Sequence, residues 1–254
     1  MSAVSLGLSG KVAVVTGGSR GLGNAIAIAM AKEGAKVVIC GRKQENLDKA
    51  VEGFDKMGLE IMAHAANVGD SEQVASLFAA VKDRFGSLDI LVNNVGMNIF
   101  TPSVAETDEK LWDKIIETNL KGTFLPSCEG IKLMKSGVGG KIINISSVAA
   151  RKAAQGMGVY CVAKAGLEML TKVLAVEHAK DRINVNAVAP GMVKTPFSQP
   201  FWSNEKLLKQ ITATVPMGRI ADTDDVIGAV LFLASSLSDY ITGEVVTVDG
   251  GSIA

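Results

Sequence analysis

Short runs of β-branched and other apolar residues alternate with helix-like patterns along almost the whole chain, and this alternation constrains the fold most strongly. The first run, residues 11–16 (KVAVVT), is bounded by glycines and is typical of a buried strand. Further strands are predicted at residues 36–40, 59–65, 88–92, 141–145, 183–188 and 244–248. Helices are predicted at residues 21–32, 44–57, 71–85, 107–135, 158–179, 203–214 and 224–235.

This order of elements predicts an α/β fold with a doubly wound parallel sheet and helices on both faces. The strand runs are continuously apolar, as expected for strands buried on both faces. One such domain accounts for residues 1–254. Ser71 is expected to cap its helix. Thr107 is expected to cap the next, with Asp108 and Glu109 in the first turn, where the helix dipole favours anions.

Charge and cysteine usage exclude several classes of protein. The 26 Lys and Arg balance the 26 Asp and Glu, which argues against a general nucleic-acid binder and gives no polybasic membrane surface. The three cysteines are odd in number and widely spaced, so we expect no disulfide framework or zinc site and a reducing compartment. Residues 1–10 lack a signal-peptide pattern, and no apolar run approaches the ~20 residues of a membrane span. We therefore expect a cytoplasmic protein.

Metal and hydrolase chemistry find no support in the sequence. The two histidines, His64 and His178, are far apart, and HExxH does not occur, so we expect no metal site and no serine-hydrolase triad. Cys161 is interpreted as a packed thiol. Arg151 and Lys152 are interpreted as a solvated loop, with contact to an anionic substrate as the alternative.

A glycine-rich segment, Thr16-Gly17-Gly18-Ser19-Arg20-Gly21-Leu22-Gly23, joins the first strand to the first helix. Glycines allow phosphate oxygens to approach backbone N–H groups at a helix N-terminus. Its TGxxxGxG spacing differs from GxGxxG, the standard dinucleotide-binding fingerprint. The alternative interpretation is a tight strand–helix turn that binds no ligand. The position between strand and helix favours a dinucleotide.

Two arginines flank the place where an adenosine would lie. Gly41 stands at the end of the second strand, where sites that prefer NAD carry an acidic residue, and Arg42 follows it. A guanidinium can pair bidentately with a ribose 2′-phosphate, and Arg20 could reach the same phosphate. These residues favour NADP(H), although two solvated surface cations would look the same in sequence.

Polar residues that follow two other strands suggest acid–base chemistry. Asn93 and Asn94 can tie strand ends together. Ser147 follows the fifth strand, and Tyr160 and Lys164 lie four residues apart, which places them on one helix face. A cation beside a phenol favours the phenolate and is expected to lower its pKa from about 10. With a Ser hydroxyl to orient a carbonyl, this set suits a ketone or a secondary alcohol.

Together these motifs resemble the short-chain dehydrogenase/reductase family over essentially the whole chain. The motifs that carry the resemblance are the Thr16–Gly23 loop, Asn93 to Gly96, Asn119, Ser147, Tyr160 with Lys164, Pro190-Gly191 with Thr195, and Val248 to Gly251. Val95 and Asn67 stand where Ala and Asp are common in the family. Neither departure removes a required group, since Asn67 keeps an acceptor and gains a donor.

The resemblance implies a Rossmann-type sheet in the order 3-2-1-4-5-6-7 and a homotetramer built on the long helices and the last strand. It implies that Tyr160 is the general acid or base, that Ser147 holds the substrate oxygen, that Lys164 binds the nicotinamide ribose and that Asn119 holds a relay water. The implied cofactor-binding residues are Gly17, Ser19, Arg20, Gly21, Leu22, Arg42, Asn67, Val68, Asn94, Gly96, Tyr160, Lys164, Pro190, Gly191, Val193 and Thr195.

The substrate is expected to be a medium-sized, mostly apolar ketone or alcohol, covered by a lid at about residues 192–215. The expected pocket residues are Met97, Asn98, Ala149, Gln155, Met157, Phe197, Phe201 and Trp202. The chain also resembles 3-oxoacyl-thioester reductases and tropinone-type ketone reductases, so a 3-oxoacyl thioester is the alternative substrate. A non-catalytic NADP(H)-sensing protein is the alternative from another class.

Overall fold

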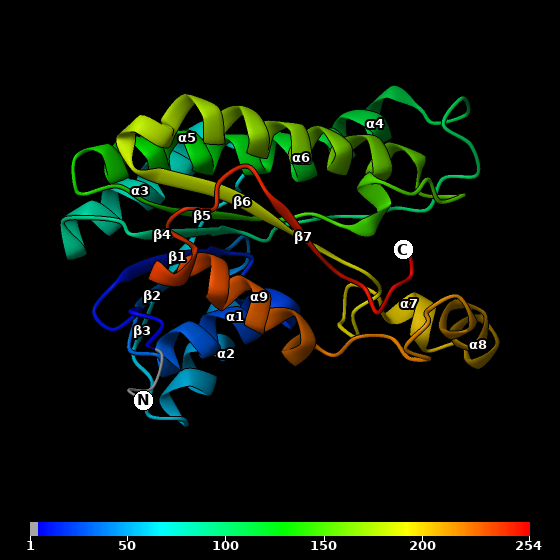
Figure 1. Cartoon of the computed structure of the whole chain (residues 1–254), viewed down its shortest axis with the longest axis horizontal. Helices are drawn as coiled ribbons and strands as arrows, with labels where there is room; N and C mark the ends of the chain where they lie inside the picture. The colour runs from blue at the N-terminus through cyan, green and yellow to red at the C-terminus, as the bar shows by residue number, and fades with distance from the viewer. Residues whose placement is uncertain (1–4) are drawn as a thin grey trace.

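A seven-stranded sheet in the order β3-β2-β1-β4-β5-β6-β7, with every pair of neighbours parallel, runs through the molecule (Figure 1). This computed structural model describes residues 5–254. Residues 1–4, the start of the segment that lacks a signal-peptide pattern, lie outside the described residues. The strands are β1 (Val12–Thr16), β2 (Lys36–Gly41), β3 (Ile61–Ala65), β4 (Ile90–Asn93), β5 (Gly140–Ile145), β6 (Ile183–Pro190) and β7 (Val245–Val248). The predicted fold class and strand order are therefore confirmed.

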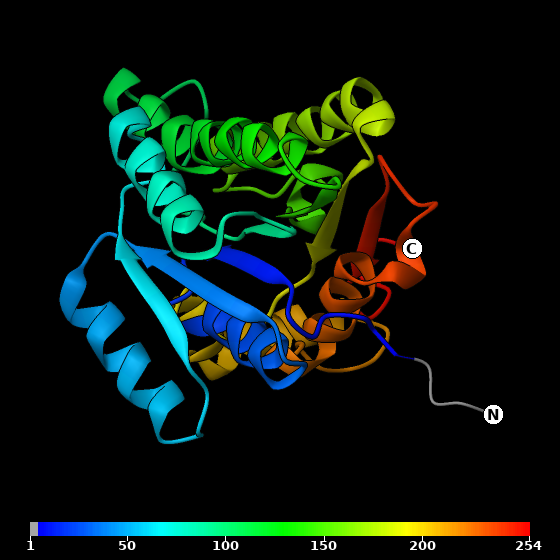
Figure 2. The ribbon, with the colours of Figure 1, turned by 90° about the vertical axis from the view of Figure 1, so that its left-hand side faces the viewer.

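Helices cover both faces of the sheet. In Figures 1 and 2, α1, α2 and α9 lie on one face, and α3, α4, α5 and α6 lie on the other. Their bounds are α1 (Gly21–Lys32), α2 (Gln44–Asp55), α3 (Ser71–Phe85), α4 (Glu109–Ile116), α5 (Gly122–Lys135), α6 (Gly158–His178) and α9 (Thr223–Ala234). Two short helices, α7 (Gln199–Trp202) and α8 (Glu205–Ala213), project beyond the carboxyl ends of the strands.

The core consists of two apolar layers separated by the sheet. On β1, Ala13 and Val15 belong to the layer beneath α1 and α9, whereas Val12 and Val14 belong to the opposite layer. This alternation follows from the two-residue repeat of a strand. The expectation of strands buried on both faces fails for the edge strands β3 and β7. Most of their residues are only half buried, because each has one neighbouring strand.

Two predicted helix caps are wrong by one residue. The Asp70 carboxylate, rather than Ser71, accepts hydrogen bonds from the N–H groups of Glu72 and Gln73 at the start of α3. Asp108 likewise caps α4, whereas the Thr107 hydroxyl donates to a backbone carbonyl before the helix. In both cases a carboxylate lies next to the hydroxyl residue, and a charged acceptor makes the stronger bond to backbone N–H groups.

The long helix predicted over residues 107–135 is interrupted by a π-helical turn, η1 (Glu117–Lys121). This interruption does not change the apolar spacing enough for the sequence pattern to reveal it. The helix predicted over 203–214 is confirmed as α8 (Glu205–Ala213), which begins after Asn204, whose side chain accepts from the Leu207 N–H. The short helix α7 is not predicted by the sequence pattern. In the part of the chain that the structure describes, no helix is long and apolar enough to cross a membrane.

Candidate active site

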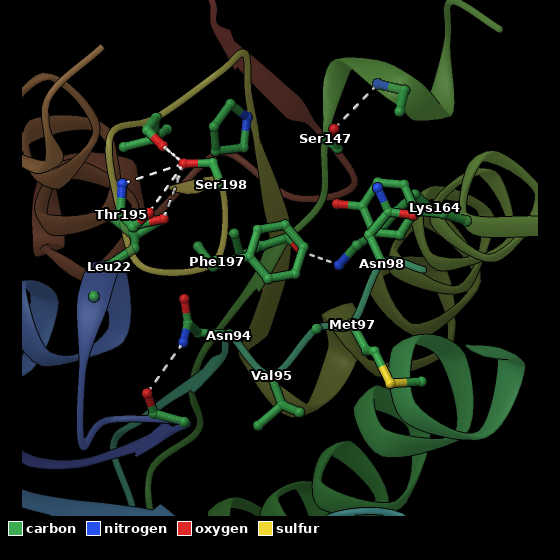
Figure 3. A pocket seen from close by; sticks show the side chains of 18 of the residues that line it. Leu22, Asn94, Val95, Met97, Asn98, Ser147, Lys164, Thr195, Phe197 and Ser198 are labelled. Atoms are coloured by element: carbon green, nitrogen blue, oxygen red, sulfur yellow. Dashed lines mark hydrogen bonds between the residues drawn. The ribbon is translucent and has the colours of Figure 1, made fainter. Parts of the chain in front are cut away.

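A cavity of about 800 Å³ opens at the carboxyl ends of the strands. It extends from the ends of β1 and β2 to the residues that follow β7, and the 192–215 segment lines one side. In Figure 3 the turn that carries Thr195, Phe197 and Ser198 faces the segment that carries Asn94, Val95 and Met97. Its volume lies in the range typical of a cofactor or small-molecule site.

The glycine-rich loop brings bare backbone to one end of this cavity. Gly17 adopts a φ of +66°, which side-chain-bearing residues rarely adopt. A Cβ at Gly23 would lie 2.4 Å from Asn94 Nδ2, so the helix can approach β4 only with glycine there. No described side chain caps the start of α1 and no acidic residue lies in its first turn, so its N–H groups suit an anionic phosphate.

The charge of the cavity lining has one sign. Its charged residues are Arg20, Arg42, Lys43, Lys152 and Lys164, and no carboxylate occurs among the described lining residues. Arg20 and Arg42 are exposed and form no ion pair with another described residue. Their guanidinium groups therefore remain available to a bound anion beside the glycine-rich loop.

Asn94 holds the ends of β1 and β4 together. Its N–H donates to Thr16 Oγ1 at 2.9 Å, and its side-chain amide donates to the Thr16 carbonyl at 3.1 Å. The neighbouring Asn93 amide donates to Asn144 Oδ1 on β5 at 2.9 Å. The expectation that these asparagines tie strand ends together is confirmed, and the ties fix the floor of the cavity.

Asn119 lies within the π-helical turn and is completely buried. Its Oδ1 accepts from the Met97 N–H at 3.1 Å, and its Nδ2 donates to the Met97 carbonyl at 2.8 Å. Nδ2 also donates to the Ile115 carbonyl, one of the helix carbonyls near the irregular turn. The side chain thus fixes the backbone of Met97, the residue after Gly96, and does not itself line the cavity.

Ser147, Tyr160 and Lys164 converge on the cavity from the segment after β5 and from α6. The Ser147 hydroxyl accepts from the Ala149 N–H at 3.1 Å. The Lys164 Nζ donates to the Ile145 carbonyl at 2.8 Å and lies 5.7 Å from the centroid of the Tyr160 ring. The four-residue spacing thus places the phenol and the ammonium side by side, as the helix period requires.

Burial dominates the protonation of this cluster. Desolvation raises the pKa of Tyr160 to about 12, although a hydrogen bond with Ser147 opposes the rise. Burial also lowers the pKa of Lys164 to about 8. The expectation that the pKa of the phenol is lowered is wrong for this structure, because the loss of water on burial is the largest influence on that pKa. At neutral pH the pair is a neutral phenol beside an ammonium, which can donate a proton to a substrate oxygen.

The turn after β6 carries an aromatic side chain over the cluster. The ring centroids of Phe197 and Tyr160 are 6.5 Å apart. Ser198 is buried and accepts from the Thr195 N–H, while its hydroxyl donates to the Val193 carbonyl. No sequence motif indicates that Ser198 braces this turn. The Trp202 indole N–H also donates to the Thr195 carbonyl, at 3.1 Å, so Trp202 supports the turn from behind.

The cavity includes all sixteen residues expected at the cofactor and six of the eight expected at the substrate, which are Met97, Asn98, Ala149, Met157, Phe197 and Phe201. Trp202 and Gln155 are corrections to the expected substrate pocket. Trp202 faces the Thr195 carbonyl, and Gln155 is an exposed residue on the loop before α6. Neither lines the cavity.

Arg151 and Lys152 lie on an exposed turn, as the interpretation of a solvated loop predicts, but Arg151 also has partners that the sequence does not indicate. Arg151 Nε donates to Glu168 Oε2 at 3.1 Å, and Ser146 Oγ donates to Glu168 Oε1 at 3.0 Å. Arg151 Nη1 reaches Thr247 on β7 at 3.0 Å. This network joins the residue before Ser147 to α6 and β7. Sequence reasoning misses it because its members are far apart along the chain and only Glu168 shares the helix face of Tyr160 and Lys164.

The whole chain has close likenesses among known proteins. A family model described as "Enoyl-(Acyl carrier protein) reductase" matches residues 17–252. The human "Dehydrogenase/reductase SDR family member 4" is 38% identical over 245 residues, which cover 96% of this chain and 88% of the relative. The chain belongs to the short-chain dehydrogenase/reductase family. It is therefore a member of an oxidoreductase family that uses nicotinamide cofactors.

Other similar proteins carry different names within this family. A tropinone reductase homolog of Arabidopsis thaliana is 37% identical over 245 residues, covering 96% of this chain and 92% of that protein. A gluconate 5-dehydrogenase of Burkholderia cenocepacia, solved with NADP and tartrate, superposes with a TM-score of 0.93. It is 31% identical and covers 98% of this chain and 97% of its own. A short-chain type dehydrogenase/reductase of Mycobacterium marinum gives 0.93 at 30% identity, with 98% of each chain covered.

Proposed function

We propose that this protein interconverts a ketone and a secondary alcohol with NADP(H). The observation that carries the proposal is one continuous cavity. Arginines without an ion-pair partner among residues 5–254 lie at one end, and the Ser147, Tyr160 and Lys164 cluster lies at the other. We treat residues 1–254 as one dinucleotide-binding and catalytic domain, with the 192–215 segment as its lid.

Reduction would proceed by proton donation from the chain to the substrate oxygen. Ser147 orients the carbonyl, and the Tyr160 hydroxyl donates its proton to the oxygen as negative charge develops there. When bound, NADPH supplies the hydride that the carbonyl carbon accepts. Oxidation of the alcohol reverses these transfers, with Tyr160 as base. The Lys164 ammonium, held by the Ile145 carbonyl, favours negative charge on the phenol oxygen.

The lining fits a dinucleotide phosphate. The glycine-rich loop and the uncapped start of α1 would hold the pyrophosphate. Arg20 and Arg42 would hold the 2′-phosphate, and Gly41 offers no carboxylate to repel it. Lys164 and the 190–195 turn would hold the nicotinamide ribose and ring. A structure solved with NADP among the similar proteins supports this choice of cofactor.

We place Asn119 in the site as a positioning residue. Its side chain is fully engaged with the backbone of Met97 and Ile115, which holds the loop after β4 against the cavity. The relay of protons through a water at this residue is an inference from the family resemblance alone. The hydrogen bonds of the Asn119 side chain to the backbone explain why an asparagine is required at this position, with no role for a relay water.

We also infer a homotetramer. Apolar side chains remain exposed on the helices that the resemblance assigns to subunit contacts, among them Trp112 on α4, Phe124 on α5 and Met169 on α6. Exposed apolar surface of this kind is typical of protein interfaces. Sedimentation of the purified protein would test the tetramer directly, and a monomer at micromolar concentration would contradict it.

A ketone panel tests the proposed reaction. It should contain cyclic ketones, steroids, diketones and 3-oxoacyl thioesters, with oxidation of NADPH and of NADH followed separately. We expect turnover of apolar ketones and a higher kcat/KM with NADPH. A preference for NADH would overturn the role of the arginines. Preferred turnover of 3-oxoacyl thioesters would favour the alternative substrate. Binding of NADPH without turnover of any compound would favour a cofactor-sensing protein.

A further inference from the structure

Lys152 differs in its position from the other exposed cations of the cavity. Arg20, Arg42 and Lys43 follow β1 and β2, at the end assigned to the adenosine. Lys152 follows β5, and its Nζ donates to the carbonyl of Ser252, beyond β7, at 3.2 Å. In the sheet order β5 is separated from β1 by β4. At the usual strand spacing, the end of β5 therefore lies about 10 Å from the end of β1, where the glycine-rich loop begins. Lys152 therefore belongs to the substrate end.

The ammonium of Lys152 has no negative partner in the described structure. It forms no ion pair with residues 5–254, and its one hydrogen-bond partner is a neutral carbonyl. The adjacent Arg151 is in the opposite situation, since Glu168 neutralises it at 3.1 Å. The two consecutive cations on this loop thus differ in their contacts. Arg151 is paired within the fold, and Lys152 faces the cavity.

The surroundings of Lys152 favour an amphipathic ligand. Ala153 and Ala154, which follow Lys152, and Ile253, which follows its partner Ser252, are apolar residues of the lining, and no carboxylate occurs among the described lining residues. Lys152 is itself exposed, so it lies at the rim. An anion bound there keeps part of its hydration, which avoids the large desolvation cost of a buried ion pair. The flexible lysine stem can exchange the Ser252 carbonyl for a carboxylate.

We propose that the substrate carries a carboxylate that pairs with Lys152 at the rim while its carbonyl or hydroxyl carbon lies at Tyr160. The substrate class is then an oxo acid, or the corresponding hydroxy acid, with an apolar body between the two groups. This inference rests on the proposed oxidoreductase function and adds a second recognition point to it.

The test compares ketones that end in a carboxylate with their primary amides, in a series of graded chain length. Each pair differs in charge and hardly in size. With saturating NADPH, the protein is expected to prefer the acid of one or more pairs. Lys152→Gln is expected to lower the acid-to-amide ratio of kcat/KM about threefold to tenfold, the range of an ion pair partly open to solvent. The loss should appear in KM, and Lys152→Arg should restore the preference.

Lys209→Gln is the matched control, because Lys209 is an exposed lysine of α8 that does not line the cavity. It removes the same charge from α8, the helix that lines the cavity through Ile211, and should leave the ratio as in the parent protein. An equal fall in both variants would mean that general surface charge attracts the acid. A weaker NADPH affinity in Lys152→Gln, with an unchanged ratio, would place Lys152 at the cofactor and overturn the proposal.

Failure of this inference is distinguishable from failure of the proposed function. If neutral ketones are reduced and no acid is preferred over its amide, only the carboxylate proposal is wrong. If no ketone is reduced at all, the reaction is wrong, and binding still tests Lys152. In that case the acid should raise the Tm of the NADPH-bound protein more than the amide does, and Lys152→Gln should abolish that difference. Equal shifts in both proteins would overturn the proposal.

Discussion

The two ends of the cavity use polar residues in opposite ways. At the end proposed for the adenosine, Arg20 and Arg42 are exposed and unpaired among the described residues, so solvent screens their charge. At the catalytic end, Tyr160 and Lys164 are buried, and the loss of water favours the neutral form of each group. It therefore raises the pKa of Tyr160 and lowers the pKa of Lys164. We infer that one end selects a ligand by charge, whereas burial sets the protonation of the groups at the other.

The largest expected effect comes from the buried end. Tyr160→Phe removes the hydroxyl that donates the proton and leaves the ring against Phe197. We expect kcat for ketone reduction to fall by roughly 10²- to 10⁴-fold, the usual contribution of general acid catalysis. The Kd of NADPH, measured by fluorescence titration, should stay close to that of the parent protein. Near-full turnover in this variant would contradict the assigned role of Tyr160.

The next effect belongs to the exposed end. Arg42→Ala should weaken NADPH binding by about 1.5–3 kcal/mol if a charge-assisted contact to the 2′-phosphate is lost. NADH binding should hardly change, because NADH lacks that phosphate. The difference between the variant and the parent should shrink as salt is added, since the contact is open to solvent. Equal losses for both cofactors would show that Arg42 supports the fold instead.

A pH profile tests the effect of burial on Lys164. Its pKa in the folded protein is lowered from 10.5 to about 8, so the ammonium loses its proton as pH rises through about 8. We expect kcat/KM for NADPH, which reports on the free enzyme, to fall about tenfold per pH unit above that value. Tyr160 keeps its proton throughout this range, since its pKa is about 12. A flat profile up to pH 10 would mean that Lys164 keeps an ordinary pKa.

The same pKa shift has a consequence for stability with a definite sign. Between pH 8 and 10.5 the unfolded chain holds the Lys164 proton, whereas the folded protein has released it. The folded state binds fewer protons in this window, so the contribution of Lys164 to the free energy of unfolding rises with pH. Lys164→Met should remove that pH-dependent contribution in denaturant titrations carried out across the window.

The smallest expected effect concerns the ion pair at the margin of the buried end. Glu168→Gln removes the charge opposite Arg151 and keeps an oxygen that can accept from Ser146. We expect the free energy of unfolding to fall by about 1 kcal/mol or less, as for an ion pair in contact with solvent. Glu168→Ala leaves the Ser146 hydroxyl without that acceptor and should cost about 1–3 kcal/mol. Equal losses in the two variants would assign the whole effect to the charge.

The sequence predicts the sheet well because strand order and burial leave a strong repeating pattern. The apolar runs at β1 and β4 are continuous because each of these strands has neighbours on both sides and helices on both faces. Local caps are less predictable, because Asp70 and Ser71 are adjacent residues that can each cap a helix. The choice between them depends on which side chain reaches the free N–H groups in the folded chain.

The candidate site divides along similar lines. Short local motifs bring Tyr160 and Lys164 together through the period of a single helix, so the sequence is sufficient to place them. The pKa of Tyr160 depends instead on everything packed around it, and the motif alone suggests the wrong direction. Residues on irregular segments are the least predictable. Trp202 and Gln155 are close in sequence to lining residues, and their side chains face elsewhere.

The π-helical turn at Glu117–Lys121 sets the rotational phase of α5 relative to α4. It contains one residue more than a regular turn would use, and one residue corresponds to a rotation of about 100° about a helix axis. In the observed phase, Ser127 on α5 accepts from the Asn93 amide at the end of β4. Deletion of a single residue from this turn would rotate Ser127 away from Asn93 and leave a buried amide short of a partner. The geometry of the cavity floor therefore depends on the count of residues in a helix behind it.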